Sequence, residues 1–368
     1  GIIDQPNQIW IRKDWKEKLN LADPKSMDDV LEIAKAFQKE YGGYGLTEDQ
    51  NLDCFKILAP AWGANPGIWI EGENGKLAYG SVQPEMKEAL QAYAQWYKEG
   101  IIDPEFTTKD LEKMLQGEIS SSVGVSPYYQ YWGYDPGPNV VQNLGADAIF
   151  EPYEIPSANG GEVKASVTFA NYGYIVVSKG CKNPEAVLKL LNFYAHVMDE
   201  GDEEDADFIN ELFGNAYTNI PYALRVINPN TDYNQFVKVS GALEKGLDED
   251  PAALGKDGVK YSNSVDFIKE GASTGVGDYL QQGGPKAAYR ISKEIIDNEQ
   301  YIKDAMWGPA TETLLSAGST LDDILTEGFT KIIVGEESID YFDTLVDNWA
   351  KAGGTKATEE INETYGNN

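Results

Sequence analysis

The segment QIWIRKDW, residues 8–15, begins the part of the chain from which the fold can be predicted. Its stretch Ile9–Ile11 is apolar, β-branched and aromatic, which predicts a buried β-strand. In the segment PKSMDD, residues 24–29, Ser26 can accept a hydrogen bond from the free backbone amide three residues later, as at a helix start. Apolar side chains then recur at helical spacing over residues 30–37, and Gly42 and Gly43 end the helix. A strand followed by a capped amphipathic helix is typical of α/β proteins.

Elements of both kinds recur along the rest of the chain. Amphipathic helices are predicted over residues 84–100, 185–198, 319–335 and 338–354, and strands over residues 119–125 and 174–177. Serines at positions 319 and 338 are the predicted N-caps of the last two helices. The stretch 228–284 is polar, glycine-rich and weakly periodic. Because single hydrophobic cores rarely grow beyond about 250–300 residues, a chain of 368 residues predicts an α/β fold with two lobes.

The charge balance excludes several classes of function. The chain has 60 acidic and 30 basic residues, a formal net charge of −30, which argues against binding nucleic acid or anionic lipid. The single histidine, His196, excludes zinc sites that need several histidines. The acidic run 199–207 lacks the residue order of a calcium loop, so we predict no metal and no cofactor. Cys54 and Cys181 fit no CxxC spacing and are predicted to be small buried side chains.

One short segment concentrates aromatic side chains. Tyr128, Tyr129, Tyr131, Trp132 and Tyr134 follow Ser126-Pro127, which resembles a helix start after the strand predicted at 119–125. Ligands of α/β proteins bind where strands end, so these aromatics predict a binding wall. Core packing is the alternative, and it remains open at this point.

Three further tryptophans are candidates for the same site. Trp62, Trp69 and Trp307 are flanked by glycine and proline, which places them on predicted loops. Flat aromatic rings together with Asp, Asn and Gln acceptors suit sugars, whose CH faces stack and whose hydroxyls form hydrogen bonds. One ring contributes roughly 1–3 kcal/mol by burial, whereas micromolar affinity needs about 8 kcal/mol. Several rings must therefore converge in a cleft.

Short motifs in a fixed order run along the whole chain. They are residues 9–15 (IWIRKDW) with Pro24–Asp29, residues 96–105 (WYKEGIIDPE), Gly117-Glu118, residues 172–177 with Asn183–Ala186 (NPEA), and residues 329–335 (FTKIIVG), 349–354 (WAKAGG) and 360–363 (EINE). Together they resemble the bacterial extracellular solute-binding proteins of family 1, the sugar receptors of ABC importers. The resemblance is closest to the lipoproteins of Gram-positive bacteria.

The resemblance implies a periplasmic-binding-protein-like fold of type II, with two α/β lobes that close on ligand about crossover strands. In this numbering, residues 1–12 hold a crossover strand, residues 13–165 and 300–368 form the C-terminal lobe, and residues 166–299 form the remaining part of the N-terminal lobe. It implies an extracellular protein without catalytic activity that binds a carbohydrate, in particular an oligosaccharide, and delivers it to ABC transporter permease subunits. The segment Tyr128–Trp132 and Trp307 fall where sugar-binding relatives place stacking aromatics.

The sequence departs from the family in two places. Relatives begin with a signal peptide, a lipidated cysteine and the first units of the N-terminal lobe, which this sequence does not contain. We therefore expect an N-terminally truncated chain that lacks the lipid anchor to the membrane, binds its sugar weakly and self-associates. Residues 41–45 (YGGYG) replace a calcium-like loop of some relatives, which predicts no calcium there.

Two other classes of function remain open from the sequence. A secreted glycoside hydrolase would need two carboxylates that nothing singles out among the 60 acids. A carbohydrate-adhesion module would need no transporter. The GxSxG match at residues 271–275 has no histidine after it, so we interpret it as a glycine-rich loop rather than a nucleophile elbow.

Overall fold

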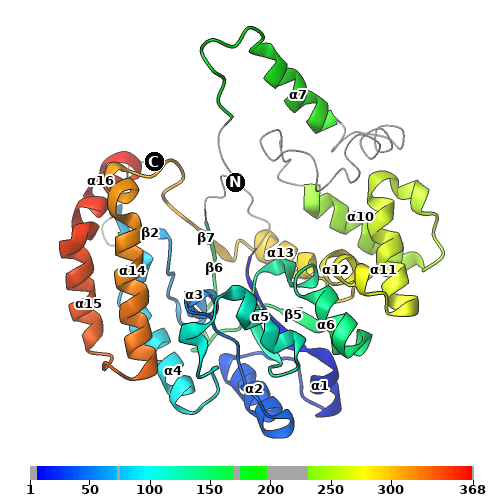
Figure 1. Cartoon of the computed structure of the whole chain (residues 1–368), viewed down its shortest axis with the longest axis horizontal. Coiled ribbons are helices and arrows are strands. Elements are labelled where there is room, and N and C mark those ends of the chain that lie inside the picture. Colours follow the sequence, from blue (N-terminus) through cyan, green and yellow to red (C-terminus); the bar gives the residue numbers. More distant parts are fainter. Residues whose placement is uncertain (1–5, 73–74, 169–174, 197–230, 367–368) are drawn as a thin grey trace.

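The fold is centred on a three-stranded antiparallel sheet (Figure 1). The computed structural model describes residues 6–72, 75–168, 175–196 and 231–366. Strand β1 (Gln8–Arg12) lies between β4 (Val125–Tyr128) and β5 (Phe150–Tyr153), with Ile9 opposite both Pro127 and Tyr153. Every residue of β1 is buried. The strand predicted at Ile9–Ile11 is confirmed.

Two shorter pairs of strands complete the described β-structure. Strand β2 (Trp69–Glu71) pairs antiparallel with β3 (Leu77–Tyr79). Strand β6 (Ala165–Val167) pairs parallel with β7 (Tyr301–Lys303), which joins two segments far apart in the sequence.

Helices surround the sheet. They are α1 (Lys13–Lys18), α2 (Met27–Tyr41), α3 (Asp53–Leu58), α4 (Met86–Lys98), α5 (Leu111–Ile119), α6 (Gly137–Leu144), α7 (Glu185–Ala195), α10 (Thr231–Lys245), α11 (Gly258–Glu270), α12 (Val276–Asp278), α13 (Ala288–Asp297), α14 (Glu312–Val334), α15 (Tyr341–Trp349) and α16 (Thr355–Tyr365). Helices α14, α15 and α16 pack together beside α4, whereas α10, α11 and α13 form a second group (Figure 1). No helix in the described ranges has the length and apolar character that a bilayer crossing requires.

Alternate side chains of β1 enter two different hydrophobic cores. Ile9 and Ile11 belong to the larger core, which includes α2, α4 and the C-terminal helices. Trp10 points the other way, as the two-residue period of a strand requires, into a core that contains Phe267 and Leu280. Part of the segment 166–299 therefore packs on this sheet, and the lobe boundaries stay a prediction.

Three predicted elements differ from the structure near their ends. Ser338, predicted as an N-cap, lies ahead of α15, which begins at Tyr341 with Asp340 at the N-cap position. Ser319 lies inside α14, which begins at Glu312. Glu360 accepts hydrogen bonds from the Thr313 backbone N–H at 2.9 Å and from its hydroxyl at 2.7 Å. A side chain from α16 thus supplies the N-terminal acceptor that Ser319 was expected to supply, and no local pattern reveals it.

The strand predicted at residues 119–125 is also displaced. Residue 119 ends α5, and β4 runs from Val125 to Tyr128, so Ser126 and Pro127 belong to the strand instead of beginning a helix. Strand β4 lies at an edge of the sheet, where a proline can pair without interrupting the hydrogen-bond ladder.

The cysteine prediction is correct at one position. Cys54 is buried as predicted, but Cys181 is exposed, and both thiols are free. Residues 175–177 form no strand in the described chain, so that prediction is wrong for these three residues. Tyr174 and the acidic run 199–207 lie outside the described residues.

The helix start at Ser26 provides a direct test of a predicted feature. Its hydroxyl accepts from the Asp29 N–H at 3.2 Å, and the Asp29 carboxylate accepts from the Ser26 N–H at 2.9 Å, which confirms the capping box. Ser26→Ala should lower the free energy of unfolding by about 1 kcal/mol, measured by urea denaturation. Ser316→Ala is the control, because that hydroxyl bonds only to carbonyls of its own helix. An equal loss in both variants would contradict a capping role.

Candidate ligand-binding site

The antiparallel order of the central sheet brings three chain segments to one edge. Because β1 runs against both of its neighbours, the end of β4, the start of β1 and the end of β5 lie together, with Gln8 opposite Tyr128 and Ile9 opposite Tyr153. The chain that leaves β4 carries the aromatic run, and the chain that leaves β5 lines a cavity. The candidate site is therefore built beside a strand that is buried throughout.

Two tyrosines after β4 lie parallel to each other, and we call Tyr129 and Tyr131 the tyrosine pair. Their ring centroids are 5.4 Å apart with 7° between the ring planes. Tyr131 is 42% exposed and Tyr129 is half-buried. Tyr128 is buried beneath them and meets both rings edge-on, at 5.2 Å and 5.7 Å. The pair thus forms an aromatic surface supported from below.

The backbone under the tyrosine pair is fixed by side chains from distant elements. The Trp10 indole N–H donates to the Tyr129 carbonyl at 3.2 Å. Gln281 Nε2 donates to the carbonyl of Gln130, and the Ser292 hydroxyl donates to the Gln130 side-chain oxygen at 2.8 Å. These partners come from β1, the segment after α12 and α13, so the position of the pair depends on three separate parts of the chain.

Trp132 and Tyr128 are buried, whereas the sequence predicted that they line a binding wall. Trp132 is fully buried, stacks on Trp10 at 5.4 Å and donates its indole N–H to Glu118. A ring enclosed in this way has no face for a ligand, so Trp132 is a core residue, and the prediction of a stacking wall at this ring is corrected. Tyr128, only 2% exposed, supports the pair without lining the surface.

Two carboxylates adjoin the tyrosine pair. Asp49 is buried ahead of α3, and Asp53 is the first residue of that helix. Burial, together with the charges of Asp53 and Asp49, raises the pKa of the Tyr129 hydroxyl, so this phenol remains a neutral hydrogen-bond donor. Asp49 is fully buried and accepts from Asn51 and the Asp53 N–H, so only the half-buried Asp53 can serve as an acceptor for a sugar hydroxyl beside the aromatic faces.

A buried glutamate holds the start of α3 in place. Glu48 accepts hydrogen bonds from the backbone N–H groups of Cys54 at 3.1 Å and Phe55 at 2.8 Å, and from the Tyr93 hydroxyl at 2.8 Å. Burial raises the pKa of Glu48 to about 8 despite these hydrogen bonds. Helix α3 thus begins on a carboxyl group that belongs to the core.

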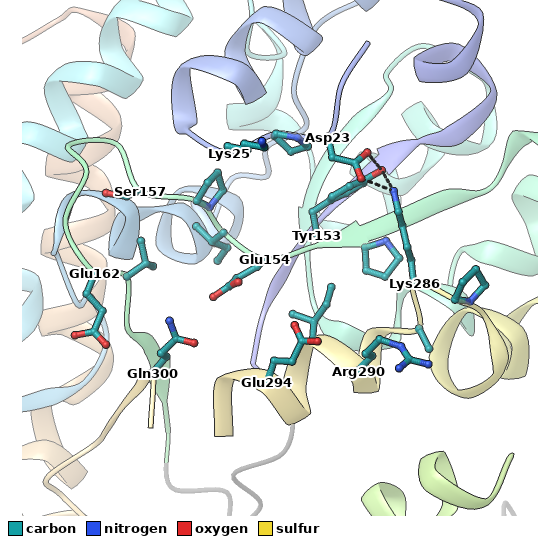
Figure 2. Close-up of a pocket in the computed structure, with 18 of the residues that line it drawn as sticks. Asp23, Lys25, Tyr153, Glu154, Ser157, Glu162, Lys286, Arg290, Glu294 and Gln300 are labelled. Atoms are coloured by element: carbon teal, nitrogen blue, oxygen red, sulfur yellow. Dashed lines mark hydrogen bonds and ion pairs between the residues drawn. The ribbon is translucent and has the colours of Figure 1, made fainter. Parts of the chain in front are cut away.

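A cavity of about 480 Å³ opens at the same sheet edge, where the chain leaves β5 (Figure 2). Its walls are the loop between α1 and α2, residues 152–163 and the start of α13. Figure 2 shows Glu154 and Glu294 extending into the space from different walls. Burial of the carboxyl group and the negative charge of Glu294 both raise the pKa of Glu154. These carboxyl groups can accept hydrogen bonds from a hydroxyl-rich ligand.

The positive charge of Lys286, in the cavity wall, is compensated by neighbouring groups. Lys286 Nζ lies 2.9 Å from Asp23, 2.8 Å from the Tyr153 hydroxyl and 3.2 Å from Glu151. Burial alone would raise the pKa of Asp23, but hydrogen bonds from Lys16 and Lys286 outweigh it and lower this pKa to about 2. This cluster fastens the loop before α13 to the loop after α1.

The structure separates the predicted tryptophans from the tyrosine pair. Trp69 is only 3% exposed, and its backbone N–H donates to the Asp304 carboxylate at 3.0 Å while its carbonyl accepts from the Ala305 N–H at 2.8 Å. These bonds bring Trp69 to the loop that carries Trp307, whose ring is 37% exposed. Trp62 is half-buried against Trp96 at 5.7 Å. Trp307 stays a prediction as a ligand contact, whereas Trp69 is corrected to a core residue.

Glu154 and Lys286 were missed as site candidates from the sequence, whereas Tyr131 was included in the predicted binding wall. Tyr131 lies within the aromatic run, and its outward direction follows from β4 ending at Tyr128 and a 3₁₀ turn over Gln130–Gly133. The predicted binding wall did not separate this exposed ring from Tyr128 and Trp132, which the structure buries. Glu154 and Lys286 carry no local signal, because their neighbours in the cavity come from other parts of the sequence.

Comparison with known proteins identifies related sequences. The family model described as bacterial extracellular solute-binding protein matches residues 2–196. The lipoprotein LipO of Bacillus subtilis strain 168 is 26% identical, over 96% of this chain and 68% of that protein. The polygalacturonan/rhamnogalacturonan-binding protein YtcQ of the same strain is 23% identical, over 97% of this chain and 67% of that protein.

A solved structure shares the fold. The crystal structure of the alginate-binding protein AlgQ2 without calcium ion superimposes with a TM-score of 0.60 at 16% sequence identity, and the match covers 98% of this chain and 72% of that one. This likeness confirms the predicted fold class, a periplasmic-binding-protein-like α/β fold.

Proposed function

The chain belongs to the family of bacterial extracellular solute-binding proteins, and from this premise we propose that it binds a carbohydrate, in particular an oligosaccharide, at the sheet edge that carries the tyrosine pair. The observation that carries the proposal is the tyrosine pair itself, with the half-buried carboxylate Asp53 beside it. YtcQ is named for binding polygalacturonan and rhamnogalacturonan, and AlgQ2 is named for binding alginate, which supports this ligand class.

The proposal extends to transport. Proteins of this family act outside the cell, and we propose that this protein delivers its ligand to the permease subunits of an ABC importer and is held at the cell surface by a lipid anchor. The proposed lobes are residues 13–165 with 300–368, and residues 166–299. The parallel pair β6 and β7 lies at the proposed junction of these segments and would serve as a hinge.

Binding without chemistry is the second part of the proposal. The GxSxG match lies between helices: Gly271 ends α11 in a left-handed conformation, φ 68°, and residues 273–275 form a 3₁₀ turn. A nucleophile elbow instead joins a strand to a helix. This placement supports a binding protein over a serine hydrolase built on this match, whereas a glycoside hydrolase would use two carboxylates instead.

The test is calorimetric titration with a glycan panel that includes maltotriose, a neutral trisaccharide, and trigalacturonate, an acidic one. We expect saturable binding of at least one glycan and no release of reducing ends over hours. Binding of amino acids or peptides with no response to any glycan would contradict the ligand class. Steady release of reducing ends in proportion to protein concentration would contradict binding without turnover.

Removal of one stacking ring tests the position of the site. Tyr131→Ala should weaken glycan binding by roughly 1–3 kcal/mol, the contribution of one buried aromatic face, without changing the thermal midpoint. Tyr134→Ala is the matched control: Tyr134 is 43% exposed, against 42% for Tyr131, but its hydroxyl contacts Asp278 and Lys260. Equal affinity of the wild type and Tyr131→Ala would remove the tyrosine pair from the site.

A further inference from the structure

We propose that Glu118 is a positioning residue for the tyrosine pair, and that ionisation of its carboxyl group loosens the pair and weakens ligand binding as pH rises. This inference rests on the proposed function for its second part only. Its first part, the control of the segment 126–134 by Glu118, concerns the ligand-free protein.

Glu118 holds both ends of the segment that carries the pair. One carboxyl oxygen accepts from the Ser126 hydroxyl at 2.6 Å, and the other accepts from the Trp132 indole N–H at 2.5 Å. Tyr129 and Tyr131 lie between these two anchors in the sequence. A single side chain of α5 therefore sets the span between the end of β4 and the turn that follows it.

The surroundings of Glu118 offer no positive charge in the described part of the chain. Its side chain is fully buried. The titratable groups that face it are Tyr44, Tyr128, Cys54 and Asp135, all of them neutral or acidic. The ammonium group of Lys109 lies over the Tyr44 ring at 5.3 Å and pairs with Asp103 at 2.5 Å.

This environment opposes the charged form. Burial raises the pKa of Glu118 to about 7, although the hydrogen bonds from Ser126 and Trp132 favour the carboxylate. The group therefore titrates near neutral pH, where most carboxyl groups are already ionised. Ionisation places an uncompensated charge in the core beneath the tyrosine pair, and the protein relieves it by admitting water to this segment.

The hydrogen-bond chain around Glu118 can accept its proton without losing Trp132. An indole N–H can only donate, so the oxygen facing Trp132 remains an acceptor in both states. The proton then resides on the oxygen facing Ser126, whose hydroxyl turns toward Thr47 Oγ1 at 3.3 Å, and Thr47 turns toward Cys54 Sγ at 3.6 Å. The neutral acid thus keeps every contact and leaves no buried charge.

The first experiment needs no ligand. Hydrogen–deuterium exchange of peptides covering residues 125–135 is followed by mass spectrometry from pH 5.5 to 8.5, with the intrinsic pH dependence of exchange removed. We expect protection to fall through neutral pH in the wild type and to stay constant in Glu118→Gln, whose amide oxygen can still accept from Trp132. Glu112→Gln is the control, an exposed acid on the same helix, and should follow the wild type.

The second experiment measures affinity for maltotriose and trigalacturonate over the same pH range. If binding requires neutral Glu118 and raises its pKa by about one unit, wild-type affinity falls roughly tenfold between pH 5.5 and 8.5, and Glu118→Gln abolishes this dependence. If neither trisaccharide binds at any pH, the proposed ligand class fails for these probes, while the exchange experiment still decides whether Glu118 positions the segment.

The outcomes separate positioning from mere stability. Identical pH profiles of exchange in the wild type and Glu118→Gln would overturn the proposal, even if the variant is less stable. Should Glu118→Gln fail to fold, Ser126→Ala replaces it, because loss of this hydroxyl removes a donor to the carboxylate. The exchange transition should then move to higher pH, and an unmoved transition would also overturn the proposal.

Discussion

Trp132→Ala should lower the free energy of unfolding by about 3–5 kcal/mol. The ring is fully buried, stacks on Trp10 at 5.4 Å and lies 4.8 Å from the ring of Phe150, so its removal leaves a cavity in the core that includes the central strand. The substitution also removes one hydrogen-bond donor from the buried carboxyl group of Glu118. Urea denaturation measures the loss.

The control for this substitution is the neighbouring residue. Tyr131→Ala removes an aromatic ring one position earlier, but at the surface, and should change stability by no more than about 0.5 kcal/mol. The opposite outcome would contradict the prediction. If Trp132→Ala unfolds at the same urea concentration as the wild type and loses only affinity for glycan, the ring contacts ligand and does not stabilise the core.

The stability of the protein should be greatest near pH 4–5 and should fall as pH rises to 8. Burial raises the pKa of Glu118 from 4.5 to about 7 and that of Glu48 from 4.5 to about 8. Between the unfolded and folded values, the folded state binds more protons, so stability falls with rising pH. At roughly 1.4 kcal/mol per pKa unit, Glu118 alone contributes on the order of 3 kcal/mol to this fall.

At acidic pH the dependence of stability on pH reverses, and stability falls as pH falls. Hydrogen bonds from Thr313 lower the pKa of Glu360 to about 2, and the two lysines beside Asp23 lower its pKa to about 2 against the effect of burial. These contributions are present above pH 4 and are lost as pH falls toward 2. Urea denaturation from pH 3 to 9 measures both limbs, and a stability that rises from pH 5 to 8 would contradict the prediction. Glu118→Gln should flatten the neutral limb.

The parts of the fold that depend on neighbouring residues could be predicted from the sequence. Ile9–Ile11 forms a strand because its composition is strand-like, and Ser26 caps α2 because its partner lies three residues away. The start of α14 could not be predicted, because its acceptor, Glu360, comes from another helix. The extent of β4 could not be predicted either, since Pro127 is acceptable only at a sheet edge.

The location of the candidate site could be predicted, but the orientation of its rings could not. The aromatic run begins on the last residue of β4 instead of after a strand at 119–125, and the binding wall predicted at Trp132 is wrong, because this ring turns into the core. The direction of each ring depends on where β4 ends, at Tyr128, and on a carboxyl group buried in α5. Sequence spacing alone contains neither fact.

The position of β1 at the centre of its sheet has a consequence for the time course of folding. Ile9 must meet both Pro127 and Tyr153, so no neighbouring strand exists until most of the first half of the chain has been made. Such distant pairing slows folding because a long loop must close first. At a synthesis rate of about 5–20 residues per second, the first strand waits roughly 7–30 s for its second neighbour. Translation therefore sets the interval during which this apolar strand lacks its second neighbour in the growing chain.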